Sequence, residues 1–508
     1  MSQSILSHLF NARLLSLIVS IFLIFISIIG PSDTQIFALI ISLNFTELVS
    51  IYKASESFFR MPDSINRLIV FSLAIIFLIL SAKFPPIKNN ENKLGNISFT
   101  ILYSILFLTI LLTDNLYNIV VLIMFVLSIH HFIFYAKNRF ENKEIFLLLS
   151  FLLFFSYPFF HSYIFISSSI TEADNYTRFL LGIPLYLMIR EMNYRRDYFL
   201  YIINISALIL FPVSFFFYII QDLERARIFT SSSSIFGNIS IVYFLFSVLS
   251  MYYFKKYKLK YPILPILASI SSLLAWSLSG ARFSILIVIL FFLLLVIHPT
   301  YRKNIADFFN LKGLIYLLVI LLVFISSNSF ERLSNISMSS FSDFNNPQSN
   351  YWKKDDDITP RLLIWTGTIN MIKENTMQGV GLDNFNNELY QQIVNKKIQP
   401  IRKDLDNPTA GFNHAHSQYL DIFAKLGIVG FMLLINLIIA NIYFFKRLAN
   451  ETDNNVFSVF GMLFIIFHIF IMINHVIISH HQSTIFMVML LMFFAGMSMS
   501  SKQRKVDQ

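Results

Sequence analysis

The long apolar segments of this chain constrain its fold more than any other feature. Apolar runs of roughly 18 residues, the length that crosses a bilayer as a helix, recur from one end of the sequence to the other. Hydrophobic residues fill 56% of the 508 positions, and charged residues fill only 13%, well below the share in ordinary soluble domains. We therefore predict an all-α, polytopic integral membrane protein with roughly 12–14 transmembrane helices, for which the bilayer replaces water as solvent.

Composition and charge exclude several other classes. The chain has no cysteine, which excludes disulfides and thiolate metal sites. Its net charge of +10 is spread over short loops, as expected for retention of cytoplasmic loops, and we predict no nucleic-acid binding. The first apolar run is followed by Pro31-Ser32-Asp33 rather than by a small-residue cleavage site. We therefore interpret that run as the first span and not as a signal peptide.

One large polar segment interrupts the apolar runs and divides the chain. We predict N-terminal transmembrane helices over 1–327, a large extramembrane loop domain over 328–417, C-terminal transmembrane helices over 418–500, and a cytoplasmic tail over 501–508. The shorter spans are candidates for broken or re-entrant helices. The candidate spans are 14–30, 35–52, 68–82, 97–112, 116–135, 145–167, 179–189, 198–220, 236–254, 263–279, 283–297, 314–326, 419–445, 457–477 and 484–500.

Basic loops predict the orientation of these spans. These loops lie at 190–196, 255–260, 302–303, 446–447 and 502–505. If all of them are cytoplasmic, the sides of successive loops alternate correctly across the spans over most of the chain. The opposite face then receives the segments 168–178, 221–235, 279–282, 328–417 and 474–483. In the first third the alternation fails, and we expect that one of the first five spans is miscounted.

The large loop contains a predicted helix. Thr359 is a suitable N-cap and Pro360 a suitable first helical residue, and the helix is expected to end before the turn Gly379-Val380-Gly381. Apolar residues at helical spacing line one face of this helix, namely Leu362, Trp365, Ile369 and Ile372.

Arg282, Arg361 and His416 come from distant parts of the sequence, yet the predicted orientation places all three on one face. Arg282 lies at membrane depth in a Ser-Gly-Ala corner, where a charge is costly unless it is paired or faces a polar cavity; the alternative is snorkelling to the lipid head groups. Arg361 opens a helix, where free backbone N–H groups attract anions; the alternative is a solvated charge paired with the run Asp355–Asp357. Both arginines are candidates for phosphate binding.

His416 precedes a membrane helix and is the candidate general base. The positive end of that helix disfavours imidazolium, which would leave the ring neutral and able to accept a proton. A lone interfacial histidine is more often structural, but two arginines on the same face favour catalysis. His414 is secondary, and Gly427 and Gly430 predict a face for close helix packing.

Other polar residues on the same face are weaker candidates. Arg178, Arg225 and Arg227, together with His414, are candidates for a glycan or lipid path. The Asp355–Asp357 run is typical of a solvated turn. His475, His480 and His481 lack an acidic partner, so we predict no metal site.

These motifs resemble the O-antigen ligase family, which shares its fold with O-antigen polymerases and bacterial protein O-oligosaccharyltransferases. His416-Ser417, nine residues and Gly427-Ile428-Val429-Gly430 are similar to the family signature His-(Asn/Ser/Gln)-x9-Gly-x-x-(Gly/Thr/Tyr). The Ser279–Arg282 corner, and then Arg361, Trp365 and Gly379-Val380-Gly381, follow the family order. The resemblance runs from about residue 168 to the C-terminus.

The resemblance implies a GT-C-like glycosyltransferase of the bacterial inner membrane, with its active site on the periplasmic face and the 328–417 loop in the periplasm. It implies transfer of a glycan from undecaprenyl pyrophosphate to a hydroxyl of lipid A–core, without metal, nucleotide or other cofactor. His416 would be the base, and Arg282 and Arg361 would hold the pyrophosphate. Two alternatives remain: a polymerase that uses the same donor, and an anionic-lipid transporter, against which the chain shows no repeated halves.

Overall fold

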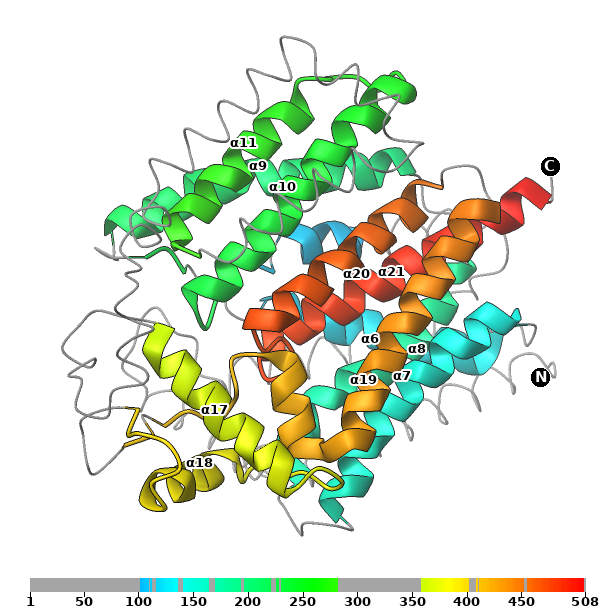
Figure 1. Cartoon of the computed structure of the whole chain (residues 1–508). Helices are drawn as coiled ribbons and strands as arrows, with labels where there is room; N and C mark the ends of the chain where they lie inside the picture. Colours follow the sequence, from blue (N-terminus) through cyan, green and yellow to red (C-terminus); the bar gives the residue numbers. More distant parts are fainter. Residues whose placement is uncertain are drawn as a thin grey trace, which may run out of the picture.

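The computed structural model describes residues 101–281 and 358–506, apart from short gaps at 109, 112–115, 136–139, 164–169, 193–195, 221–224, 228–229, 402–407, 410 and 452–454. Arg282, the spans predicted before residue 101 and the two predicted between 283 and 326 lie outside the described residues, as do Asp355–Asp357. All the regular structure in the described part is helical, which confirms the all-α class (Figure 1).

The described helices agree closely with the predicted spans. Six of them are long and apolar enough to cross a membrane, and two shorter apolar helices accompany them, which confirms a polytopic membrane protein. The helices are α6 (Leu116–Tyr135), α7 (Asn142–His161), η2 (Ile170–Tyr176), α8 (Thr177–Arg190), α9 (Arg196–Ile220), α10 (Ser233–Lys256), α11 (Leu264–Ser279), α17 (Ile358–Glu374), α18 (Phe385–Val394), α19 (Gln418–Glu451), α20 (Val456–Asn474) and α21 (His481–Val506).

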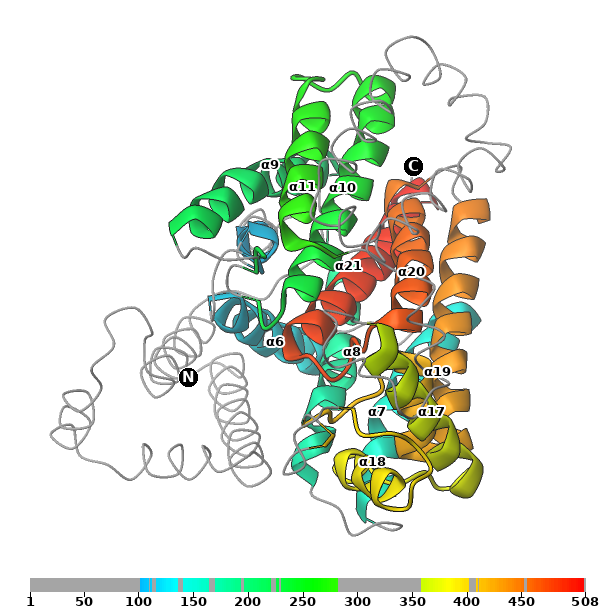
Figure 2. The same cartoon turned by 60° about the vertical axis from the view of Figure 1, so that its left-hand side comes forward.

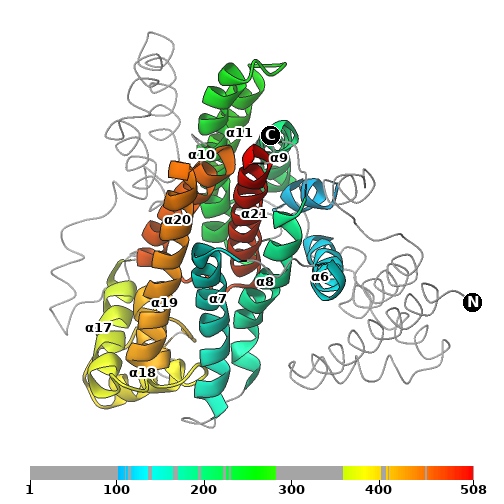
Figure 3. The same cartoon turned by 90° about the vertical axis from the view of Figure 1, so that its right-hand side faces the viewer.

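The loops sort to two ends of the bundle as the charge pattern predicts. Figure 2 shows the turn between α10 and α11 and the C-terminus at one end, and α17, α18 and the turn between α20 and α21 at the other. At the first end, Asn455 Nδ2 donates to the carbonyl of Ser498 at 3.0 Å. At the second, Arg361 Nη1 donates to Asn474 Oδ1 at 3.2 Å. Figure 3 shows the same separation from another side.

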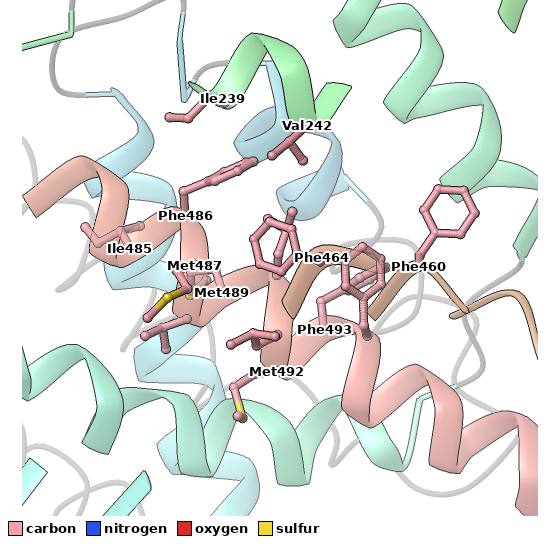
Figure 4. Packing of buried hydrophobic residues seen from close by; sticks show 14 of the residues in the cluster. Ile239, Val242, Phe460, Phe464, Ile485, Phe486, Met487, Met489, Met492 and Phe493 are labelled. Atoms are coloured by element: carbon pink, nitrogen blue, oxygen red, sulfur yellow. The ribbon is translucent and has the colours of Figure 1, made fainter. Parts of the chain in front are cut away.

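Helix α21 is the centre of the bundle. The apolar part of this helix is entirely buried, whereas much of the surface of α7 and α9 is exposed. Phe493 and Phe460 contribute to the tightly packed aromatic cluster around it (Figure 4). Small residues bring α8 within close reach, since a Cβ on Gly496 would lie 2.7 Å from Ile189. In lipid such van der Waals packing is what holds helices together.

A buried ion pair joins α7 to α8 at the end with the basic loops. Arg190 Nη1 lies 2.7 Å from Glu144 Oε1, and both side chains are 2% exposed. The hydroxyl of Tyr186 donates to the same carboxylate oxygen at 2.6 Å. Arg190 therefore does not act as a solvated loop charge, although it begins the basic segment 190–196. A charge in this position is tolerated because it is paired and hydrogen-bonded.

The loop helix forms as predicted, but its most deeply buried residues differ from those of the apolar face that the spacing indicates. Helix α17 runs from Ile358 to Glu374. Ile369 is 42% exposed, whereas the residues that enter the small core of the loop domain include Leu363, Ile364 and Met371. The difference arises because α17 contacts two elements at once, α18 on one side and the beginning of α19 on the other. A periodicity argument assumes one partner.

Candidate functional site

A break in α19 positions the site. Gly427 has φ +66° and ψ −167° within this helix, and Figure 1 shows two segments that meet at an angle. The break frees carbonyls that would otherwise accept helical hydrogen bonds. Val380 N–H donates to the Ala424 carbonyl at 2.8 Å, and Gly381 N–H donates to the Lys425 carbonyl at 3.0 Å. The turn after α17 is therefore docked into the break.

Helix α7 completes the junction. The hydroxyl of Tyr157 donates to the carbonyl of Leu426 at 3.2 Å. In the docked turn itself, the carbonyl of Gln378 is in hydrogen-bond contact with His161 Nε2. The carbonyls of three successive residues at the break, 424 to 426, thus each have a partner, as buried backbone groups require. Tyr157 and His161 were not among the predicted site residues, because nothing in the sequence pattern of α7 points to a contact so distant in sequence.

Gly427 was predicted to form a face for close helix packing with Gly430, but its close contact is with the docked turn. A Cβ added to Gly427 would lie 2.1 Å from the carbonyl oxygen of Met377. Gly430 is buried one turn later, and a Cβ there would lie 2.3 Å from the Cβ of Leu426 in the same helix. The spacing of the two glycines therefore reflects how α19 is broken and not how it meets another span.

The segment before α19 is held from two sides at Ala415. The N–H of Ala415 donates to Asp421 Oδ1 at 3.0 Å, and its carbonyl accepts from Trp365 Nε1 at 2.9 Å. His416 then adopts φ +53°, a left-handed conformation that is uncommon for residues other than glycine. The rings of His414 and His416 meet edge to face with centroids 4.4 Å apart. Strained backbone of this kind is frequent at functional sites.

The turn between α20 and α21 adds two more histidines. It is tied to α19 through Gln418, whose Oε1 accepts from Ile477 N–H at 2.8 Å and Ile478 N–H at 2.9 Å. The rings of His414 and His480 lie 5.6 Å apart, and the rings of His475 and His480 are stacked at 5.3 Å. Within the described ranges, no group of His, Asp or Glu has an arrangement that could hold a metal ion.

Arg361 faces this group of histidines. It lies in the first turn of α17, half-buried, and donates to Asn474 Oδ1 next to His475. Its charge lowers the pKa of both His416 and His475. The structure therefore brings together Arg361, His414 and His416, which the sequence analysis singled out. It adds Asn474, for which the sequence offers only a predicted outer position, and it brings in His475 and His480, which the sequence analysis considered only as weak metal candidates.

Burial keeps the imidazole of His416 neutral. Burial, together with the nearby His414, Arg361 and His480, lowers the pKa of His416 to about 3. The pKa of His480 is lowered to about 4, because burial and the nearby His414 outweigh the opposing effect of the Asp421 carboxylate. A neutral imidazole is what the sequence analysis expected for His416, and the largest cause of its low pKa is desolvation.

Two of the three remaining arginine candidates, Arg178 and Arg225, have partners elsewhere at the same end. Arg178 pairs with Asp174 at 2.7 Å and lies 2.6 Å from His481 Nδ1. Arg225 Nε donates to the carbonyl of Ser279 at 2.9 Å and so supports the corner that precedes Arg282. Arg227 is exposed. The corner itself turns at Gly280, which has φ +64°.

Comparisons with known proteins agree with these motifs. Residues 267–435 match the family model described as O-Antigen ligase, and this range includes both Arg361 and His416. A protein of Haemophilus influenzae (strain ATCC 51907 / DSM 11121 / KW20 / Rd), named only "Uncharacterized protein", is 29% identical over 412 residues. That similarity covers 77% of this chain and 96% of the Haemophilus protein.

Proposed function

We propose that this chain, a member of the O-antigen ligase family through its residues 267–435, is a glycosyltransferase that acts as an O-antigen ligase. Its donor would be a glycan on undecaprenyl pyrophosphate and its acceptor a sugar hydroxyl of lipid A–core, at the periplasmic face of the inner membrane. The observation that carries the proposal is the convergence of Arg361 and His416, from two distant segments, on one buried site at a membrane end.

The proposed reaction is a direct displacement. The acceptor hydroxyl attacks the anomeric carbon of the donor glycan, His416 takes the hydroxyl proton, and the bond from that carbon to the pyrophosphate oxygen breaks. Undecaprenyl diphosphate leaves with the bonding electrons. Arg361 and the first turn of α17 would neutralise the departing diphosphate, which is electrostatic work that guanidinium and helix N-termini do well. Arg282 is the second proposed phosphate ligand, from outside the described residues.

The low pKa of His416 fits a base that becomes competent when the donor binds. A base is most effective when its pKa lies near the working pH, and the pKa of about 3 for His416 is far below that. Arg361 contributes to this low value, so a bound pyrophosphate that compensates the arginine charge would raise the pKa of His416. Proton transfer would thereby be coupled to occupation of the donor site.

The proposal is tested on lipopolysaccharide gels from a strain that lacks this gene. Loss of a ligase is expected to leave bare core with lipid-linked polymer accumulating, because polymerisation still proceeds. Core that carries a single repeat unit would instead identify a polymerase. Transfer by the purified protein from lipid-linked donor to lipid A–core would exclude a transporter, and an absence of transfer with a correctly folded protein would overturn the proposal.

Replacement of Arg361 tests the phosphate contact. Arg361→Ala is expected to lower kcat/KM for the donor by about 100-fold, and Arg361→Lys by about 10-fold, because lysine keeps the charge but loses the forked donor geometry. Donor titrations with purified protein measure both values. Lys397→Ala, which removes an exposed cation of the same loop domain, is the matched control and should leave kcat/KM unchanged. Equal losses from Arg361→Ala and Arg361→Lys would contradict an electrostatic role.

A further inference from the structure

The first segment of α19 contains a buried ion pair that its membrane position does not explain. Asp421 and Lys425 are one helical turn apart, with Lys425 Nζ 3.2 Å from Asp421 Oδ1. The two residues are 2% and 6% exposed. A buried ion pair is weak evidence for stability, since well-packed apolar residues of similar volume are often as stable or more so. Because stability does not account for this ion pair next to the proposed site, its position points to another role for the Asp421 carboxylate.

The carboxylate holds Ala415, the residue between His414 and His416. Asp421 Oδ1 accepts from Ala415 N–H at 3.0 Å, while Trp365 Nε1 donates to the Ala415 carbonyl at 2.9 Å. One contact comes from α19 and the other from α17, so Ala415 is held between two elements. His416, the next residue, has the left-handed φ of +53°. Such a conformation costs free energy and persists only where the surroundings impose it.

We propose that Asp421 is a positioning residue, which with Trp365 clamps Ala415 and thereby holds the His416 imidazole in the geometry for proton transfer. Lys425 neutralises the carboxylate, and its ammonium lies 5.4 Å from the centre of the Phe385 ring. The inference rests on the proposed function, because holding Ala415 matters for catalysis only if His416 is the base. The competing explanation is that Asp421 only stabilises the helix start through the macrodipole, which would affect stability but not the chemical step.

Paired variants separate the two explanations. A single replacement would leave the other residue as an uncompensated buried charge, so Asp421 and Lys425 are both replaced in each variant. Asp421→Asn with Lys425→Met keeps an oxygen that accepts from Ala415 N–H, whereas Asp421→Leu with Lys425→Met is similar in shape but has no acceptor. We expect kcat of the leucine double variant to fall about 30-fold below that of the asparagine double variant, since small displacements of a catalytic group cost up to about 100-fold.

The donor KM and thermal stability complete the test. The two double variants are expected to have the same donor KM, because Arg361 is untouched, and Trp365→Phe should lower kcat in the same way from the other side of the clamp. Equal kcat in both double variants, or a kcat loss that only follows the melting temperature, would overturn the inference. Activity of a His416→Asn protein would instead overturn the proposed function, so the two failures are distinguishable.

Discussion

Replacement of His416 is expected to abolish glycan transfer. General base catalysis contributes about 100- to 10,000-fold, so we expect kcat to fall by at least about 1,000-fold. His416 has φ +53°, a conformation that asparagine tolerates better than alanine does. His416→Asn is therefore the better variant, because it removes the base while it preserves the backbone, and His416→Ala is the companion. Transfer from lipid-linked donor to lipid A–core by purified protein measures the loss.

The same variants can be examined in cells. In a strain that lacks this gene, the His416→Asn protein should reach the membrane at the normal level but leave surface O-antigen absent. Restoration of surface O-antigen by this variant would exclude His416 as the base. A loss of activity accompanied by loss of the protein from the membrane would not count for catalysis, which is why the backbone-preserving variant is the decisive one.

Replacement of Gly427 by alanine is expected to have the largest effect on stability. Two penalties combine there: a Cβ in the left-handed conformation, and a distance of 2.1 Å from that Cβ to the Met377 carbonyl oxygen. The docked turn must move, and the hydrogen bonds from Val380 and Gly381 to α19 would be lost with it. We expect unfolding free energy to fall by about 3 kcal/mol or more, measured by thermal or denaturant unfolding in detergent.

Gly411 offers a matched control for this experiment. It has φ +68°, but a Cβ added there would meet nothing within 4 Å. Gly411→Ala therefore carries the conformational penalty alone, expected at about 1–2 kcal/mol. The loss for Gly427→Ala is expected to be larger, because it includes displacement of the docked turn and a ψ of −167° that at this φ is almost restricted to glycine. If both variants lost the same stability, the turn would not be docked at the break as described.

The sequence by itself determined the class of the molecule and where its chemistry could lie. The apolar runs predicted α6 to the residue, and the predicted spans locate the other long helices within a few residues. The reason is physical: a bilayer requires a minimum apolar length and forces every backbone hydrogen bond inside the segment. The positions of the basic loops then assigned each helix end to one of two faces. On that assignment Arg361 and His416 were expected on the same face.

Only the tertiary structure decided how those residues are held. The break at Gly427 is built by hydrogen bonds from Val380, Gly381 and Tyr157, none of which is near it in sequence. The clamp on Ala415 and the histidines of the α20–α21 turn arise in the same way. Spacing within one element predicts which side chains share a face, but it carries no information about which distant donor satisfies a backbone group that the element leaves open.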